Sequence, residues 1–147
     1  MNLRFLDRYQ NFAIFLLRVS FGVLFIFHGL GKLMAGTEMW QNLGKNIIGE
    51  WGPDFIPTVL GLLAVLTEFV GGMLLLVGFF TRVACLLMLV TMLGAIKFHV
   101  SAGDPFSVYS HPIKAAVVFL VLFITGPGRY SLERMIWPNK TVEEPPQ

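Results

Sequence analysis

The sequence contains little cysteine and little charge, and both shortages limit what the chain can be. Cys85 is the only cysteine among 147 residues, so an intrachain disulfide and a dithiol redox motif are both excluded. Only 14% of the residues are charged, whereas about a quarter are charged in a typical soluble domain. The net charge of +2 is too small to suggest a nucleic-acid partner. The composition therefore favours a membrane protein over a soluble domain.

Apolar residues make up 55% of the chain and are concentrated in four runs. About 20 predominantly apolar residues cross a bilayer, so these runs predict transmembrane helices at about residues 12–31, 56–80, 83–99 and 111–126. The fourth run is short, so either Lys114 snorkels to the interface or this helix begins earlier. We expect an all-α integral membrane four-helix bundle in one domain, residues 1–133, followed by a polar tail, residues 134–147.

The long connection between the first two runs has a helical pattern of its own. Trp40, Leu43, Ile47 and Trp51 recur at spacings of three and four residues, which is typical of an amphipathic helix. We expect this helix, from Thr37 to Trp51, to lie at the membrane surface with its tryptophans at headgroup level. It serves either as an interfacial anchor or as a lid over this end of the bundle.

Basic residues are unevenly distributed over the two sides that four spans would define. Six lie on the side of the termini and four on the opposite side. Cytoplasmic loops carry an excess of lysine and arginine, so this bias predicts cytoplasmic termini. The six are Arg4, Arg8, Arg82, Arg129, Arg134 and Lys140, and the four are Lys32, Lys45, Lys97 and Lys114.

Glu68 lies in the middle of the second apolar run, where an unpaired carboxylate would be costly. Arg18, in the first run, lies at a similar depth if both helices begin and end at the membrane surfaces. Both residues also lie on helix stripes that contain glycine or alanine, which allow close helix packing in lipid. We therefore expect a structural Arg18–Glu68 ion pair inside the bundle.

Three histidines and three lysines converge at the end opposite the termini. The candidate binding residues are His28, Lys32, Glu68, Lys97, His99 and His111. Histidine and lysine can donate to carbonyl oxygens, and histidine can transfer protons near neutral pH, so this set suits a quinone headgroup or a small anion. No recognised ligand spacing accompanies the histidines, so we expect no metal site. In the alternative interpretation, these side chains face lipid headgroups separately.

Three sequence segments resemble motifs of the DoxX family of small membrane proteins. They are Arg18–Leu33 (RVSFGVLFIFHGLGKL), Glu68–Arg82 (EFVGGMLLLVGFFTR) and Gly126–Leu132 (GPGRYSL). The resemblance implies a four-helix bundle in the bacterial inner membrane and an association with respiratory or sulfur redox chemistry, because relatives are subunits of thiosulfate:quinone oxidoreductases. Many relatives have a tyrosine–glutamate pair where this chain has Ser110-His111-Pro112, so a role that needs this glutamate does not transfer.

Two classes of function remain open at this point. The first is an accessory or anchoring subunit of a quinone-linked membrane redox system, with no intrinsic cofactor and with a membrane or soluble oxidoreductase as partner. The second is a structural membrane protein or small-molecule carrier with an Arg18–Glu68 clamp and no redox role. No complete catalytic motif decides whether the protein is an enzyme, and either class allows a homo-oligomer in the lipid bilayer.

Overall fold

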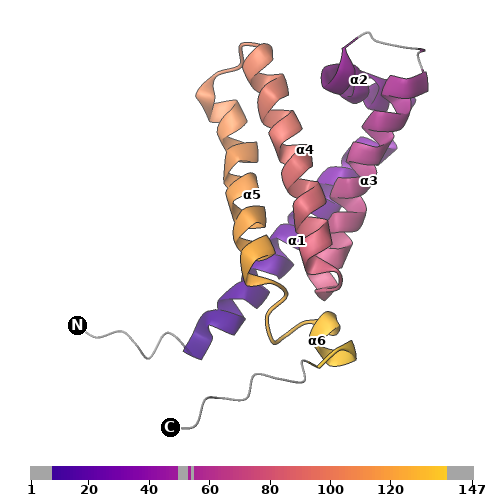
Figure 1. Cartoon of the computed structure of the whole chain (residues 1–147). Coiled ribbons are helices and arrows are strands. Elements are labelled where there is room, and N and C mark those ends of the chain that lie inside the picture. The colour runs from indigo at the N-terminus through magenta and orange to yellow at the C-terminus, as the bar shows by residue number, and fades with distance from the viewer. Residues whose placement is uncertain (1–7, 50–52, 54, 139–147) are drawn as a thin grey trace.

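The computed structural model describes residues 8–49, 53 and 55–138, and within these ranges it contains helices and no strands (Figure 1). The helices are α1 (Gln10–Met34), α2 (Thr37–Ile48), α3 (Phe55–Val77), α4 (Thr81–Ser101), α5 (Phe106–Thr125) and α6 (Leu132–Ile136). Four of them, α1, α3, α4 and α5, are long and apolar enough to cross a membrane. The prediction of an all-α four-helix membrane bundle is confirmed.

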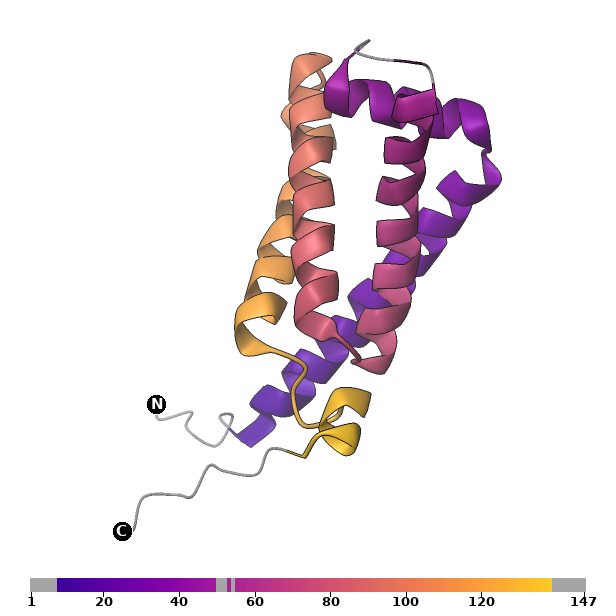
Figure 2. The ribbon, with the colours of Figure 1, turned by 45° about the vertical axis from the view of Figure 1, so that its right-hand side comes forward.

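The four long helices form two antiparallel pairs. α1 packs mainly against α3, and α4 packs mainly against α5, while α3 and α4 join the two pairs (Figures 1 and 2). The shared core consists of apolar side chains from all four helices, and it includes Phe25, Leu75, Met88, Phe119 and Leu122. Many large apolar side chains on the outer faces are exposed, as expected for helices that contact lipid.

The surface helix predicted between the first two spans is present as α2, although Trp51 lies outside the described residues. α2 packs directly on the first turns of α3. A Cβ added at Gly44 would lie 1.7 Å from the carbonyl oxygen of Pro57, and one added at Gly61 would lie 1.7 Å from that of Trp40. The two backbones approach this closely because both positions lack a side chain.

The fourth span begins earlier than the apolar run indicated. α5 starts at Phe106, five residues before the predicted start at residue 111. This is one of the two alternatives that the short run allowed, and it places the exposed Lys114 in the third turn of the helix. The remaining spans differ from the predicted bounds by no more than three residues at either end.

After α5, the chain returns to the connection between α3 and α4. Residues 126–131 lead into the short helix α6, which lies at the same end of the molecule as the start of α1 (Figure 2). The Ser131 hydroxyl caps α6 by accepting from the backbone N–H of Arg134 at 3.3 Å. The predicted domain limit at residue 133 falls inside this helix, and residues 139–147 of the predicted tail lie outside the described ranges.

Candidate functional site: two cations of α1 and a groove

The first polar centre lies between α1 and α3, near α2. Lys32 Nζ donates to both carboxylate oxygens of Glu68, at 2.8 and 2.7 Å. The Glu68 side chain is 3% exposed and the Lys32 side chain 24% exposed. Trp40 of α2 donates from its indole nitrogen to the backbone oxygen of Lys32 at 3.1 Å. This centre therefore joins three helices and neutralises a carboxylate buried within a membrane span.

The register of α1 against α3 explains this pairing. Cβ atoms added at Gly22 and Gly29 would lie 2.8 Å from the backbone of Leu76 and 2.6 Å from that of Phe69, respectively. These contacts set an antiparallel register in which Lys32 comes opposite Glu68. The first two turns of α3 extend beyond the end of α1 and pack against α2 instead.

The predicted Arg18–Glu68 ion pair is wrong for this structure, because each residue has other partners. Arg18 lies about 21 Å along α1 from Lys32, at 1.5 Å per residue, and its side chain is fully buried. Its Nη1 donates to the backbone oxygen of Leu75 at 3.2 Å, and its Nη2 donates to the backbone oxygen of Tyr130. The depth estimate failed because it assumed that α1 and α3 end at the same level.

The second polar centre therefore lies around Arg18, at the end of the molecule that holds the described chain ends. Gly78 makes room for it, since a Cβ there would lie 1.7 Å from Arg18 Nη1. Glu133 donates from its backbone N–H to the oxygen of Gly78 at 3.0 Å and accepts from the N–H of Thr81 at 3.2 Å. The sequence analysis gave no role to Gly78 or Glu133, although Gly78 lies within the motif Glu68–Arg82 and Glu133 directly follows the motif Gly126–Leu132.

Of the six candidate binding residues, the structure brings only Lys32 and Glu68 together as a pair. His28, Lys97 and His111 are exposed. His99 makes a local contact instead, with its Nδ1 2.7 Å from a carboxylate oxygen of Asp104. α4 continues through both Lys97 and His99, so these two side chains leave different faces of one helix. The geometry thus agrees better with separately placed surface groups than with one histidine–lysine pocket.

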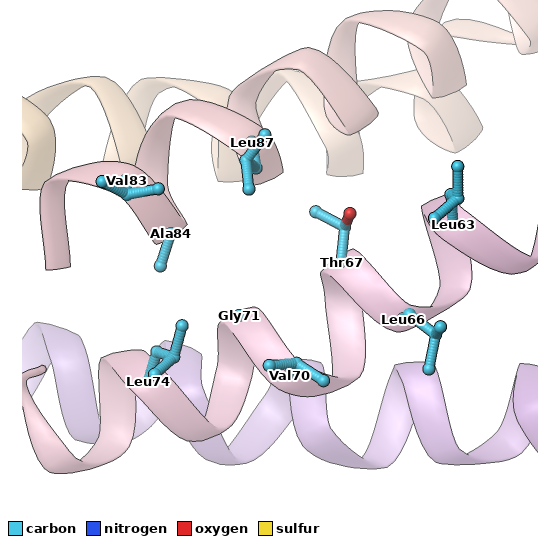
Figure 3. Close-up of a pocket in the computed structure, with 9 residues that line it drawn as sticks. All are labelled: Leu63, Leu66, Thr67, Val70, Gly71, Leu74, Val83, Ala84 and Leu87. Atoms are coloured by element: carbon cyan, nitrogen blue, oxygen red, sulfur yellow. The ribbon is translucent and has the colours of Figure 1, made fainter. Parts of the chain in front are cut away.

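A groove of about 250 Å³ lies between α3 and α4, and almost all of its lining is apolar (Figure 3). Its walls include Leu63, Leu66, Val70, Leu74, Val83 and Leu87. Thr67 is the exception, and its hydroxyl points toward α4 in Figure 3. Among the described residues this hydroxyl has no hydrogen-bond partner, whereas those of Thr91 and Thr125 donate to carbonyl oxygens four residues earlier, at 3.0 and 2.8 Å. The groove therefore offers one free hydroxyl in an apolar wall.

Comparison with known proteins identifies the family. Residues 13–102 match the family model of DoxX. The chain belongs to the DoxX family. It is 29% identical over 136 residues to the inner membrane protein YqjF of Escherichia coli, with 89% of this chain and 97% of YqjF covered. The inner membrane protein YphA of the same organism is 30% identical over 128 residues, with 80% and 85% covered.

A further relative has a name that refers to redox chemistry. CatD of Bacillus subtilis, provisionally named an oxidoreductase, is 34% identical over 83 residues, which cover 55% of this chain and 54% of CatD. No solved structure matches the chain. The relatives and the four apolar helices together establish a multi-pass membrane protein of the DoxX family.

Proposed function

We propose that this DoxX protein is an accessory membrane subunit of a redox system and binds a quinone in the groove between α3 and α4. The free hydroxyl of Thr67 carries the proposal, because it is a hydrogen-bond donor in an otherwise apolar groove. A quinone has matching chemistry, with carbonyl acceptors on an apolar ring. The groove takes the ring, and the ring's isoprenoid tail extends along the lipid-exposed helix faces.

The Lys32–Glu68 pair has a positioning role in this proposal. It fixes α3 against α1, so that the face of α3 bearing Thr67 is turned toward α4. The electrons come from a partner oxidoreductase, in line with the name of the relative CatD. The protein itself contributes membrane anchoring and a binding place for the quinone.

The test is quinone binding by the purified full-length protein in detergent. Mass spectrometry of extracted lipids identifies any quinone that copurifies, and titration with a short-chain ubiquinone analogue measures its affinity. We expect Thr67→Val to weaken binding about fivefold, the effect of about one neutral hydrogen bond. Thr91→Val is the matched control, because the Thr91 hydroxyl is already bonded within α4. Equal affinity in the wild-type protein and Thr67→Val, or no binding at all, contradicts the proposal.

A structural role without redox chemistry is the second candidate, favoured by the way in which the cations Lys32 and Arg18 are satisfied. Lys32 and Glu68 neutralise each other, and Arg18 is held by backbone oxygens. Such groups can hold helices together without any ligand. This candidate predicts that the protein copurifies with no quinone and that no oxidoreductase subunit is recovered with it after mild crosslinking in membranes.

We also propose that both termini are cytoplasmic, on the basis of the six-to-four distribution of basic residues. Single cysteines introduced at Lys45 and at Arg134, in a Cys85→Ala background, test the orientation in intact cells. A reagent that cannot cross the membrane should label Cys at position 45 and leave position 134 unlabelled. Labelling of position 134 alone reverses the assignment.

A further inference from the structure

A second pocket lies at the opposite end of the molecule from α2, and the groove described above does not include it. It has a volume of about 370 Å³ and lies between the start of α1, the end of α5 and α6. Its polar lining comes from Asn11, Arg82, Thr125, Glu133 and Arg134. Asn11 and Arg82 are the second residues of α1 and α4, and Thr125 is the last of α5. The pocket is therefore at the level where membrane-spanning helices meet the lipid headgroups.

The charges in this pocket favour an anion. Among the described residues, neither Arg82 nor Arg134 has a carboxylate within ion-pair distance. The Glu133 carboxylate also lines the pocket, but one of its oxygens accepts from the backbone N–H of Thr81. The guanidinium of Arg82 lies beside Gly126, where an added Cβ would be 3.3 Å from Nη2. Guanidinium groups bind phosphate oxygens with two parallel hydrogen bonds, which a lysine cannot reproduce.

The rest of the wall fits the glycerol and upper acyl region of a lipid. Ile14, Pro127 and Trp137 provide apolar surface, and Trp137 stacks on Phe79 with ring centroids 5.8 Å apart. Tryptophan is enriched at membrane interfaces, where its ring contacts apolar chains and its N–H remains near polar groups. A lining with both charged and apolar side chains, beside exposed helix faces, matches a molecule with a charged head and apolar chains.

We propose that this pocket binds the phosphate of an anionic membrane phospholipid, with the guanidinium groups of Arg82 and Arg134 as its donors. The lipid's acyl chains run along the exposed faces of α1 and α5. The position of the pocket at the ends of the spans favours a lipid over free phosphate as the source of this anion. The proposal is independent of quinone binding, because this pocket shares no lining residue with the groove between α3 and α4.

Native mass spectrometry of the full chain in detergent, titrated with phosphatidylglycerol or with phosphatidylcholine, tests the proposal. We expect phosphatidylglycerol to bind preferentially, and Arg82→Gln and Arg134→Gln each to weaken its binding about tenfold, as for loss of a charge-assisted hydrogen bond. Arg129→Gln is the matched control, because it removes the same charge at the same end from a residue that does not line the pocket. Its affinity should remain within about twofold of the wild-type value.

Two results would overturn the proposal. One is equal binding of phosphatidylglycerol by wild-type protein and by the Arg82→Gln/Arg134→Gln double variant. The other is displacement of the lipid by inorganic phosphate at an equal concentration, which would identify a site for free anions instead. Thermal unfolding without added lipid checks that each variant is folded. If Arg82→Gln does not fold, the comparison of Arg134→Gln with Arg129→Gln still decides, because both side chains are exposed.

Discussion

The two ends of the bundle each hold a cation of α1, the partly exposed Lys32 and the fully buried Arg18, and they satisfy it in different ways. Near α2, Lys32 meets the carboxylate of Glu68. At the other end, Arg18 meets the backbone oxygens of Leu75 and Tyr130. A lysine ammonium is a compact charge that suits one carboxylate, whereas the arginine fork has donors pointing in several directions and can join separate segments of chain.

The difference indicates what each cation holds in place. Lys32 joins two spans, and its backbone oxygen receives the indole of Trp40 from α2. Arg18 joins the end of α3 to the segment that returns after α5. The Lys32–Glu68 pair therefore holds α1 in its alignment with α3. Arg18 attaches the segment that follows α5 to the end of α3. Substitutions at the two ends should separate these effects.

The largest effect is expected for Lys32→Met, which leaves the Glu68 carboxylate buried without a cation. Loss of one partner from a buried pair costs about 3–5 kcal/mol in the free energy of unfolding. Glu68→Gln should cost less, because Lys32 is partly exposed and can turn its ammonium toward water. Denaturant-induced unfolding in detergent micelles measures both.

The Lys32→Met/Glu68→Gln double variant completes the test. It removes both charges, so it should be more stable than Lys32→Met alone, and the double-mutant cycle should give a favourable coupling. Additive effects of the two substitutions would show that the pair contributes no mutual stabilisation.

Arg18→Met should have the next largest effect, on the order of 3 kcal/mol, because hydrogen bonds from a charged group contribute about 1.5–3 kcal/mol each. The buried Nε of Arg18 has no partner within the described residues, and this reduces the net gain from the arginine. The substitution should also loosen the segment after α5, because Arg18 bonds to the backbone oxygen of Tyr130. Limited proteolysis should cleave after Arg129 or Arg134 faster in Arg18→Met than in wild type. Arg8→Met, at an exposed arginine near the same end, is the control and should leave both stability and proteolysis unchanged.

The sequence was sufficient to predict four spans, apart from the early start of α5, since each span contains an apolar run. It was also sufficient for α2, since its apolar residues recur at helical spacing. It also placed Arg18 on a stripe of α1 that contains small residues, and Arg18, Gly22, Phe25 and Gly29 of this helix are all buried. These features depend on local composition and periodicity. Their prediction does not depend on which helix packs against the stripe.

The partner of Glu68 could not be found in this way, because it depends on how far α3 slides along α1. Arg18 and Lys32 are fourteen residues apart, which at 100° per residue puts them within about 40° of each other around α1, so facing alone does not choose between them. The choice follows from the close contacts of Gly22 with Leu76 and of Gly29 with Phe69, which set the register of α1 against α3. Likewise, the division of the spans into the pairs α1–α3 and α4–α5 is not encoded by apolar periodicity.

Gly44→Ala tests whether the α2 contact sets this end of the bundle. The added methyl would collide with backbone atoms of Pro57, which cannot rotate away as a side chain can, so α2 must shift. Overpacking of this kind costs about 1–3 kcal/mol. Gly31→Ala is the matched control, because nothing lies within 4 Å of its Cβ position, and it should stabilise α1 by up to about 1 kcal/mol. Similar unfolding midpoints for the two variants would contradict the close packing of α2 on α3.

The smallest effect is expected for Asp104→Asn, which removes the carboxylate facing His99. Their side chains are 37% and 29% exposed, so water and salt screen the interaction on both sides. Pairs of this kind contribute about 0.2–1 kcal/mol, well below the buried Lys32–Glu68 pair. Unfolding of Asp104→Asn in detergent at low and at high salt measures the difference, with Glu38→Gln as an exposed carboxylate control from α2. If Asp104→Asn lowered the free energy of unfolding as much as Lys32→Met, the His99–Asp104 contact in the α4–α5 connection would stabilise this end as much as the Lys32–Glu68 pair does, which contradicts the comparison.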